Sequence, residues 1–348
     1  MKKVVHILNS ASYSGAENVV ITIIKSMKEE QDNNYDFLYL SRQGDIQSFL
    51  DVNNIKYYLL SNFSLKSIKT IIKQIKPDII HAHDFTASII SAFLFPNIPI
   101  ISHIHNNPPW IQKICLKSVL YAITLPRYKK ILTVSDAVVN EYVFNKLMKD
   151  KTLVLGNPVD TSLVNNKANE SSQSNIYDIV FLGRLAPQKN PLRLIDIVYQ
   201  VKKTIPNIRC ACIGKGPLYN ECRKKILELD LQNNIELLGF MENPYKILKN
   251  SKLLCIPSDW EGYGMVAVEA LSLGVPVVSS GVGGLKDIVT KESGKICDKD
   301  EEFVKEIIEL VHNREYQEKK AINALIRANE LNNIYEYCSV LNDIYINI

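Results

Sequence analysis

The sequence has no apolar run of the ~20 residues that a membrane-spanning helix needs. Its N-terminal segment also lacks the short apolar core that secretory signal peptides contain. We therefore expect a cytosolic protein. The net charge of +4 is too small to indicate a nucleic-acid partner, and we expect none.

Cysteine pairs with the spacing of a metal or redox site are also missing. The seven cysteines are an odd number at scattered positions, and none forms a Cys-x-x-Cys pair. This pattern is typical of reduced thiols that pack as small hydrophobic side chains.

The chain is long for a single hydrophobic core, because 348 residues exceed the ~250–300 at which cores stop growing. Its charge is unevenly spread, since the first 157 residues carry a net +6 and the remainder a net −2. The basic first part indicates contact with an anionic membrane surface or acceptor, or simply a solvated basic face.

Buried-strand patterns alternate with helical patterns along the whole chain. This alternation predicts two Rossmann-like α/β domains with parallel sheets, the first at residues 1–157 and the second at residues 158–332. We expect the amphipathic segment 333–348 to pack as a terminal helix. Strands are predicted at residues 4–8, 35–40, 55–59, 79–81, 98–102, 131–134, 178–182, 209–213, 235–238, 253–256 and 275–279.

The most informative stretch is Glu261-Gly-Tyr-Gly-Met-Val-Ala-Val-Glu269, a glycine loop and helix start bracketed by two glutamates. In a parallel sheet such a loop lies beyond the carboxyl end of a strand, where these folds bind ligands. Gly262 and Gly264 let a ligand approach the backbone, and the free N–H groups of a helix start suit an anion. Ionised carboxylates only accept hydrogen bonds, so they suit hydroxyl groups. Phosphate together with hydroxyl groups indicates a sugar nucleotide.

Two further loops of the second half follow predicted strands. The loop at residues 183–191 contains Arg184 and Lys189, which could clamp a diphosphate or could be solvated surface charges. Asn190 is expected to cap the helix that follows. The next strand ends in another glycine turn at residues 213–217, a weak signal by itself. Glycine loops at successive strand ends favour ligand binding.

The first half has a different loop after its first strand. Gly15, within Ser12-Tyr-Ser-Gly-Ala-Glu17, could bring backbone N–H groups to a phosphate or a sugar. The loop is not Gly-x-Gly-x-x-Gly, and no acidic residue clearly ends the second strand. A nicotinamide-dependent enzyme is therefore disfavoured.

Four of the six histidines form two His-x-His pairs at predicted strand ends, His81 with His83 and His103 with His105. The two members of a pair share one face of a strand, so each pair could bind a metal ion. Further ligands are not obvious, so polar groups that line a cleft are the preferred interpretation, and we expect no metal site.

Two other segments have competing interpretations. Asp298 and Asp300 resemble an acidic metal-binding pair, but we expect a surface loop because the strand context is missing. Residues 111–130 combine apolar and basic side chains with no acidic ones. This segment is either a membrane-surface helix or ordinary core-facing structure with a connector.

Taken together, these motifs resemble glycosyltransferase family 4, a group of retaining enzymes with the GT-B fold of two Rossmann-like domains that face each other across a cleft. The resemblance also implies a C-terminal helix that returns to the first domain, and residues 333–348 fit this helix. The resemblance is carried by Gly183-Arg-Leu with Gln-Lys-Asn-Pro191, by Ile213-Gly-Lys-Gly-Pro217, by Pro257–Gly264, and by Glu269–Val278 with Gly283-Gly284. The spacing of Glu261 and Glu269 matches the family's Glu-x7-Glu motif. In the first half, Ser14 replaces the first glycine of the family's Gly-Gly-Ala-Glu loop.

The resemblance implies a role for each site residue. Arg184 and Lys189 would bind the donor diphosphate. Glu261 would face the hydroxyl groups of the donor sugar, and Glu269 those of the ribose. His105 falls where such enzymes place a cleft histidine. The remaining expected donor contacts are Gly15, Gly214, Phe240, Gly262, Tyr263, Gly264, Met265 and Val266.

The expected activity is hexosyl transfer with retention, from a nucleotide-sugar donor to a glycan or lipid-diphosphate-linked acceptor in surface polysaccharide assembly. The donor is expected to be a UDP-sugar, and no cofactor or metal is expected. The protein would act in the cytoplasm or at the inner face of the membrane. Two alternatives stay open: another GT-B enzyme, such as a sugar-nucleotide epimerase or a soluble sucrose- or sugar-phosphate-type synthase, and a non-catalytic sugar-nucleotide-binding subunit.

Overall fold

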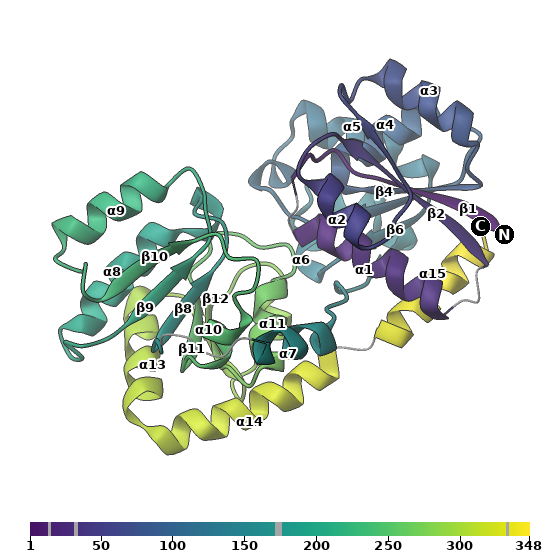
Figure 1. Ribbon diagram of the computed structural model, residues 1–348. Helices are drawn as coiled ribbons and strands as arrows, with labels where there is room; N and C mark the ends of the chain where they lie inside the picture. The colour runs from purple at the N-terminus through teal and green to yellow at the C-terminus, as the bar shows by residue number, and fades with distance from the viewer. Residues whose placement is uncertain (13–14, 31–33, 171–175, 332–333) are drawn as a thin grey trace. The chain divides into compact units, whose positions relative to one another are not determined.

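A computed structural model describes residues 1–12, 15–30, 34–170, 176–331 and 334–348 (Figure 1). The chain forms two compact units. The first comprises Met1–Val159 together with Asn333–Ile348, and the second comprises Asp160–Asn332. The division falls close to the predicted boundary at residue 157.

Among the described residues, the first unit contains a seven-stranded sheet in the order β3-β2-β1-β4-β5-β6-β7, with all neighbours parallel. The central strands β4 and β5 are wholly buried, as expected for a parallel sheet that helices cover on both faces. The strands are β1 (Lys2–Ile7), β2 (Tyr35–Arg42), β3 (Tyr57–Leu60), β4 (Ile79–His83), β5 (Ile100–Ile104), β6 (Tyr128–Thr133) and β7 (Thr152–Val154).

Helices connect these strands, and a further helix lies near the C-terminus of the chain. The C-terminal helix α15 returns to the first unit and packs against α1. Its Tyr345 is buried and lies edge-on to the ring of Tyr35, which confirms the predicted return of the C-terminal helix. The helices are α1 (Gly15–Glu30), α2 (Ile46–Val52), α3 (Leu65–Ile75), α4 (Asp84–Leu94), α5 (Leu116–Thr124), α6 (Asp136–Glu141) and α15 (Ile334–Ile346).

The second unit contains, in its described part, a six-stranded sheet in the order β10-β9-β8-β11-β12-β13, again parallel throughout. The central strand β11 is completely buried. The strands are β8 (Ile179–Leu182), β9 (Cys210–Ile213), β10 (Ile235–Gly239), β11 (Leu253–Ile256), β12 (Val277–Ser280) and β13 (Gly294–Cys297).

Most of its helices follow the carboxyl ends of the strands. Asn190 caps α8 by accepting a hydrogen bond from the Arg193 N–H at 3.1 Å, and Pro191 is the first helical residue, which confirms the predicted cap. The helices are α7 (Thr161–Asn169), α8 (Pro191–Lys202), α9 (Tyr219–Glu228), α10 (Tyr245–Lys249), α11 (Met265–Ser272), α12 (Leu285–Ile288), α13 (Asp300–His312) and α14 (Arg314–Leu331).

Two strands were not predicted, β7 and β13. Both are short and carry polar residues, so their apolar pattern is weak. Because β13 ends at Cys297, the prediction that Asp298 lacks the context of a strand was wrong. Asp298 is exposed, and Asp300 begins α13, where its carboxylate accepts a hydrogen bond from Arg193 at 2.7 Å.

Candidate functional site

Three loops lie side by side at the carboxyl edge of the second sheet, because β9, β8 and β11 are neighbours. The loops after β8 and β9 touch through their backbones. The Leu185 N–H donates to the Lys215 carbonyl at 3.0 Å, and a Cβ on Gly214 would lie 2.0 Å from the Gly183 carbonyl oxygen. Gly214 also has a φ of +142°, so only glycine fits this contact.

The loops after β8 and β11 are also joined. The Asp259 N–H donates to the Gln188 carbonyl at 2.9 Å, and the Gln188 amide donates to the Trp260 carbonyl at 3.2 Å. Asn190 adds a hydrogen bond to the Asp259 carboxylate at 2.9 Å. These bonds hold the predicted phosphate-binding loop against the predicted sugar-binding loop.

Lys189 and Glu261 meet between these two loops. The Lys189 ammonium forms an ion pair with Glu261 Oε1, and the Ser258 hydroxyl donates to the same oxygen at 3.0 Å. The Glu261 side chain is only 6% exposed. A carboxylate this deeply buried needs a countercharge, and Lys189 supplies it. Arg184, on the same loop as Lys189, is exposed at this edge.

The glycine loop Gly262–Gly264 leads directly into α11, whose first residues are Met265 and Val266. The segment after β12 packs closely against the backbone of this loop. A Cβ on Gly283 would lie 1.7 Å from the Glu261 carbonyl oxygen, and the Gly284 N–H donates to the Gly262 carbonyl at 3.1 Å. The backbone around Glu261 is therefore fixed by close contact with a second glycine segment.

Glu269 lies further along α11 and is buried. Burial raises its pKa to about 7, although a hydrogen bond with Tyr245 and the charge of Lys167 partly oppose this shift. These partners come from α10 and α7. A carboxyl group with this pKa changes its charge near neutral pH.

Two further predicted donor contacts lie at the same edge of the sheet. Phe240 directly follows β10 and is 60% exposed. Tyr263 lies in the glycine loop and is half-buried, and burial raises the pKa of its phenol to about 12. Phe240 therefore offers an open aromatic face, whereas Tyr263 is a neutral phenol held within the loop.

In the first unit, Gly15 is the first residue of α1, and Glu17 in the same turn is buried. Ser14, the predicted variant position of this loop, lies outside the described residues. His105 directly follows β5 and is also buried. Its backbone N–H donates to Asp84 Oδ1 at 3.0 Å, so the ends of β4 and β5 are tied together.

His105 belongs to a cluster of five buried histidines on one face of the first sheet. The parallel register places His6 beside His81, and His83 beside His103. Sequence reasoning found the two His-x-His pairs but missed His6, because only the pairing of strands reveals it. The paired ring nitrogens are 2.9 Å apart for His6 and His83, 2.8 Å for His83 and His105, and 3.2 Å for His81 and His103.

The cluster continues into polar side chains at two ends. His105 Nδ1 is 3.1 Å from Asn157 Oδ1, and His81 Nδ1 is 2.7 Å from the Tyr345 hydroxyl. Burial lowers the pKa of His6 to about 3 and that of His105 to about 4. It lowers the pKa values of the other three histidines as well. All five rings are neutral at neutral pH.

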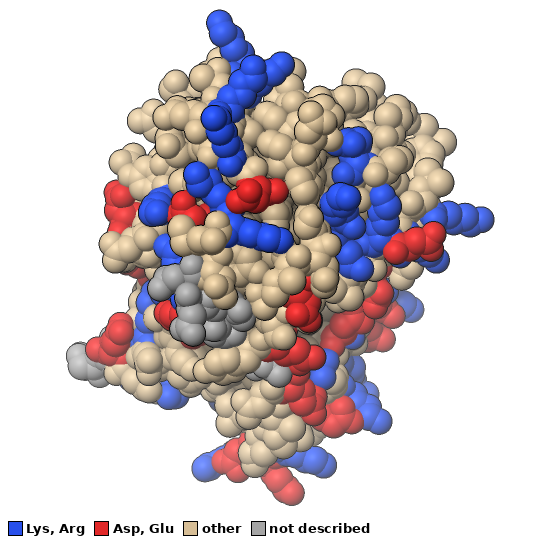
Figure 2. Space-filling model, turned by 90° about the vertical axis from the view of Figure 1, so that its right-hand side faces the viewer, with Lys and Arg blue, Asp and Glu red and all other residues tan. Residues whose placement is uncertain are grey.

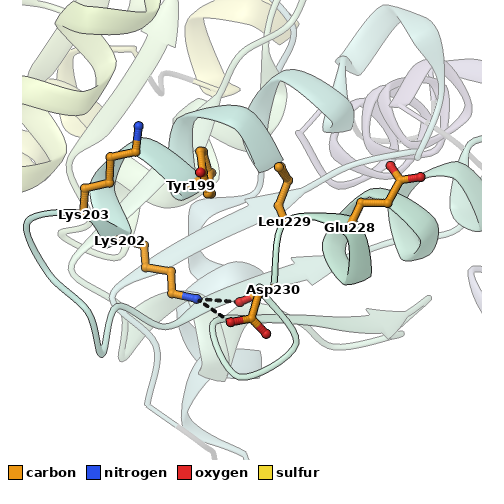
Figure 3. Close-up of a pocket in the computed structure, with 6 residues that line it drawn as sticks. All are labelled: Tyr199, Lys202, Lys203, Glu228, Leu229 and Asp230. Atoms are coloured by element: carbon orange, nitrogen blue, oxygen red, sulfur yellow. Dashed lines mark hydrogen bonds and ion pairs between the residues drawn. The ribbon is translucent and has the colours of Figure 1, made fainter.

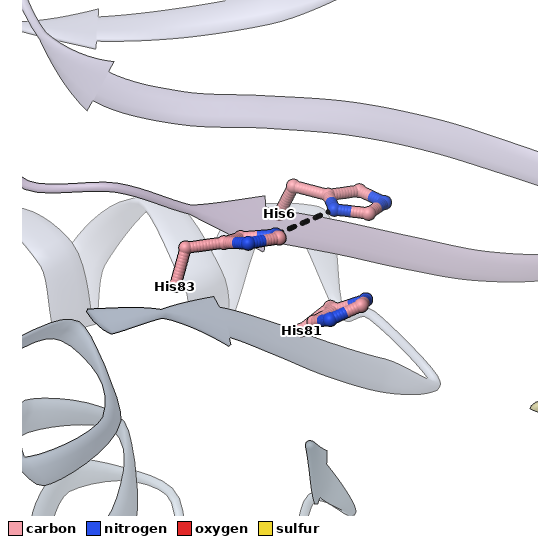
Figure 4. A group of neighbouring side chains, drawn as sticks. All are labelled: His6, His81 and His83. Carbon is pink, nitrogen blue, oxygen red and sulfur yellow. Dashed lines mark hydrogen bonds between the residues drawn. The ribbon is translucent and has the colours of Figure 1, made fainter. Parts of the chain in front are cut away.

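Two trios in this cluster have ligand atoms within 4.8 Å of one another: His6 with His81 and His83, and His83 with His103 and His105. Their rings, however, hydrogen-bond to one another or stack, and Figure 4 shows the hydrogen bond between His6 and His83. His81 and His83 have ring centroids 4.5 Å apart and planes 17° apart. Ligands of one zinc ion instead point at a common centre, with nitrogens about 3.3 Å apart for bonds of 2.0–2.1 Å. The geometry favours hydrogen-bonded imidazoles over a metal centre.

A surface hollow of the second unit lies at the other edge of the sheet, by the C-terminal ends of α8 and α9 (Figure 3). An ion pair between Lys202 and Asp230 crosses it at 3.7 Å. It is far from the glycine loops along the strands, and no predicted site residue lines it. We assign it no role in the site.

The segment predicted as a possible membrane-surface helix forms only the nine residues of α5, with a short turn on each side. Ile114, Leu116 and Ile123 are exposed there, and Lys117 lies over the ring of Trp110. Figure 2 shows one face of the molecule, on which blue cationic side chains are scattered between wide uncharged areas. No helix among the described residues combines the length and hydropathy needed to cross a bilayer.

Two family models match the chain and together span most of it. Residues 13–163 match "Glycosyltransferase Family 4", and residues 165–326 match "Glycosyl transferases group 1". The solved structure of HepE from Anabaena in complex with UDP-glucose superimposes with a TM-score of 0.87 at 19% identity, over 100% of both chains. This likeness confirms the GT-B fold.

The proteins with similar sequences are also named as glycosyltransferases. A glycosyltransferase of Methanocaldococcus jannaschii is 32% identical over 61% of this chain and 58% of its own length. UDP-Gal:alpha-D-GlcNAc-diphosphoundecaprenol alpha-1,3-galactosyltransferase of Escherichia coli is 25% identical over 83% and 82%. The capsular polysaccharide biosynthesis glycosyltransferase CapH of Staphylococcus aureus is 28% identical over 81% and 82%. The chain therefore belongs to glycosyltransferase family 4 and has the GT-B fold.

Proposed function

We propose that this protein transfers a hexose, with retention of configuration, from a UDP-sugar to a lipid-diphosphate-linked glycan in the assembly of a surface polysaccharide. The ion pair between Lys189 and Glu261 carries the proposal, because it joins the cation that we assign to phosphate and the carboxylate that we assign to sugar hydroxyl groups at one sheet edge. The names of similar proteins support the choice of ligands: HepE binds UDP-glucose, and the Escherichia coli relative acts on a diphosphoundecaprenol-linked sugar.

The donor diphosphate would lie at the loop after β8. Arg184 is exposed there, and Lys189 is partly exposed and can share its ammonium between Glu261 and a phosphate. The free N–H groups at the start of α11 would add further donors. Two cations and a helix start together would neutralise a diphosphate without a metal ion, so we propose no metal in the reaction.

The two glutamates would hold the two sugars of the donor. Glu261, fixed by Lys189 and Ser258, would accept hydrogen bonds from hydroxyl groups of the transferred hexose. Glu269 would accept hydrogen bonds from the ribose, and its ionised form would do so best. Gly214 and Phe240 would face the base, and the backbone of Gly262–Val266 would complete the contacts.

Transfer would take place on the front face of the donor sugar. As the bond between the anomeric carbon and the phosphate oxygen breaks, its electron pair leaves with UDP, and the acceptor oxygen bonds to the same face of the carbon. The acceptor proton passes to the departing phosphate oxygen. Arg184 and Lys189 would stabilise the negative charge that develops on the diphosphate.

A lipid-linked acceptor requires contact with the membrane. The segment from Pro109 to Arg127 presents exposed Ile114, Leu116 and Ile123 together with Lys113 and Lys117, and it has no acidic residue. Apolar side chains flanked by cations suit the surface of an anionic bilayer. We propose that this segment binds the protein peripherally to such a membrane.

A binding screen of UDP-, GDP- and ADP-sugars tests the donor assignment. We expect saturable binding of UDP-sugars and clear weakening by Arg184→Ala. Binding of none of them at millimolar concentration would contradict the proposal. Release of an altered free sugar nucleotide without an acceptor would instead indicate an epimerase, and binding without any turnover would indicate a non-catalytic subunit.

A further inference from the structure

One chain of hydrogen bonds runs through three of the buried histidines. It joins His6 Nδ1 to His83 Nε2 at 2.9 Å and His83 Nδ1 to His105 Nε2 at 2.8 Å. It ends at Asn157, whose Oδ1 is 3.1 Å from His105 Nδ1. A neutral imidazole carries one N–H and one lone pair, so each ring must donate at one nitrogen and accept at the other.

The groups at the two ends of this hydrogen-bond chain determine which ring nitrogens donate and which accept. At one end, Asn157 Oδ1 is an acceptor and requires a proton on His105 Nδ1. At the other end, His6 Nε2 is buried and has no hydrogen-bond partner among the described residues. A buried acceptor without a partner is tolerated better than a buried N–H without one. Both ends therefore place the proton on Nδ1 of all three rings, and the second argument holds whichever way the Asn157 amide is turned.

The burial of its partners decides which nitrogen of His105 a substrate can reach. If a substrate displaced His83, which is 1% exposed, the Nδ1–H of His83 would lose its acceptor inside the protein. That loss costs about 1–3 kcal/mol. If a substrate oxygen replaced Asn157 Oδ1, the ring N–H of each of the three histidines would keep an acceptor. A substrate oxygen is therefore expected to take the place of Asn157 Oδ1 and to accept from His105 Nδ1.

We propose that His105 is a neutral hydrogen-bond donor that offers its Nδ1–H to an oxygen of the substrate, with Asn157 as its partner in the free protein. His83 and His6 are then positioning residues: His83 donates to the lone pair of His105 Nε2 and so fixes its tautomer, and His6 donates to His83 Nε2 and so fixes the tautomer of His83. This inference rests on the proposed function, since it gives His105 a role in the same reaction.

The groups that face His105 agree with a donor role. Asp84 holds its backbone N–H at 3.0 Å and itself has a φ of +65°, so the end of β4 is shaped around this contact. Glu17 on α1 is buried, and its charge acts on the ring. With its lone pair held by His83, the ring has no free site to accept a proton. The acceptor proton must then go elsewhere, as it does when the leaving phosphate takes it.

Nitrogen NMR of the full-length protein with labelled histidines tests the tautomers directly. At pH 7.5 we expect His6, His83 and His105 each to show a protonated Nδ1 and an unprotonated Nε2, with exposed His312 as the reference. Signals are assigned from single His→Gln variants. A proton on Nε2 of His105 would overturn the inference, as would a stoichiometric metal ion in the purified protein.

A pair of variants tests the role in the reaction. In His105→Asn the amide nitrogen can reach the position of Nδ1, whereas in His105→Gln it reaches the position of Nε2. We expect the Asn variant to keep about tenfold more kcat/KM than the Gln variant, the factor that one hydrogen bond of ~1.4 kcal/mol represents. The opposite order would contradict a donor at Nδ1.

The outcomes separate this inference from the proposed function. If the wild-type protein binds no nucleotide sugar, the proposed function fails, and the NMR tautomers still decide the direction of the chain. If the wild-type protein is active but His105 carries its proton on Nε2, the proposed function stands and this inference alone fails.

Discussion

Lys189 and Glu261 are 72 residues apart in the sequence, yet they form an ion pair at the carboxyl edge of the second sheet. The pair joins the loop after β8 to the loop after β11. Because the Glu261 side chain is almost completely buried, its position depends on Lys189. The cation proposed for the diphosphate thus also orients the carboxylate proposed for the sugar.

Removal of Lys189 should therefore damage both stability and turnover. We expect Lys189→Met to lower the free energy of unfolding by roughly 3 kcal/mol, because it leaves Glu261 as a buried charge without a partner. The double variant Lys189→Met with Glu261→Gln should recover much of this stability but no turnover. Urea unfolding and initial-rate kinetics measure the two effects. Normal turnover in Lys189→Met would remove this residue from the proposed site.

The contact between the first two glycine loops gives a second expectation. In Gly214→Ala the new Cβ would lie 2.0 Å from the Gly183 carbonyl oxygen, at a φ of +142°. We expect a loss of at least ~1–3 kcal/mol of unfolding free energy, the cost of such backbone strain. Gly183→Ala is the matched control, since its nearest neighbour would be an ordinary 3.7 Å away. Equal stability of the two variants would contradict the loop packing described above.

The buried histidines should make the first unit sensitive to acid. Their pKa values are lowered by burial, to about 3 for His6 and about 4 for His105, so the unfolded chain binds protons first. Their contribution to stability is complete above pH ~6.5 and is lost as the pH falls toward these values. The loss is about 1.4 kcal/mol per histidine for each pH unit.

Urea unfolding between pH 7.5 and pH 5 measures this effect. We expect the midpoint to fall steadily below pH 6.5. The variant His312→Gln, which changes the exposed histidine, should follow the same curve as the wild type. A midpoint that stays constant down to pH 5 would show that the five rings are not buried as neutral groups.

Glu269 should make donor binding depend on pH. Burial raises its pKa to about 7, so part of the population is protonated at neutral pH and cannot accept from both ribose hydroxyls. We expect the affinity for UDP-glucose to rise from pH 6 to pH 8. UDP-glucose is the suitable probe because its diphosphate diester does not titrate in this range. Calorimetry on Glu269→Gln should show a flat profile, and a flat wild-type profile would exclude Glu269 from ribose binding.

Membrane contact is tested by co-sedimentation with vesicles that contain anionic lipid. We expect Ile114→Ser with Leu116→Ser, and separately Lys113→Ser with Lys117→Ser, to weaken binding several-fold. Ile322→Ser in α14 is the control, because Ile322 is a comparably exposed apolar residue at 62%. High salt should weaken the wild-type interaction. Equal effects of the control and of the variants at residues 113–117 would contradict a specific membrane surface.

Much of the fold was predictable because its signals are local. A buried strand, a glycine turn and a capped helix lie within a dozen residues, as in the segment that ends with Asn190 and α8. The strands β7 and β13 were missed because three or four residues of mixed polarity carry little pattern. Their positions depend on pairing with β6 and β12, and a short stretch of sequence does not reveal this pairing.

The candidate site was predictable only as separate parts. Lys189 and Glu261 could be assigned to phosphate and sugar, but nothing in the sequence indicates that they pair with each other. The histidine cluster shows the same limit. The His-x-His spacing predicts a shared face, whereas the addition of His6 and Asn157 requires the register of the strands and the fold of the connection.

The most direct test of the account is a transfer assay with a UDP-hexose and a lipid-diphosphate-linked sugar, followed by NMR of the anomeric centre of the product. We expect a glycan extended by one hexose whose anomeric configuration is that of the donor. Lys189→Met and Arg184→Ala should abolish the product. An inverted anomeric centre, or no transfer from any UDP-hexose while the protein is folded and binds UDP, would contradict the proposed retaining glycosyltransferase.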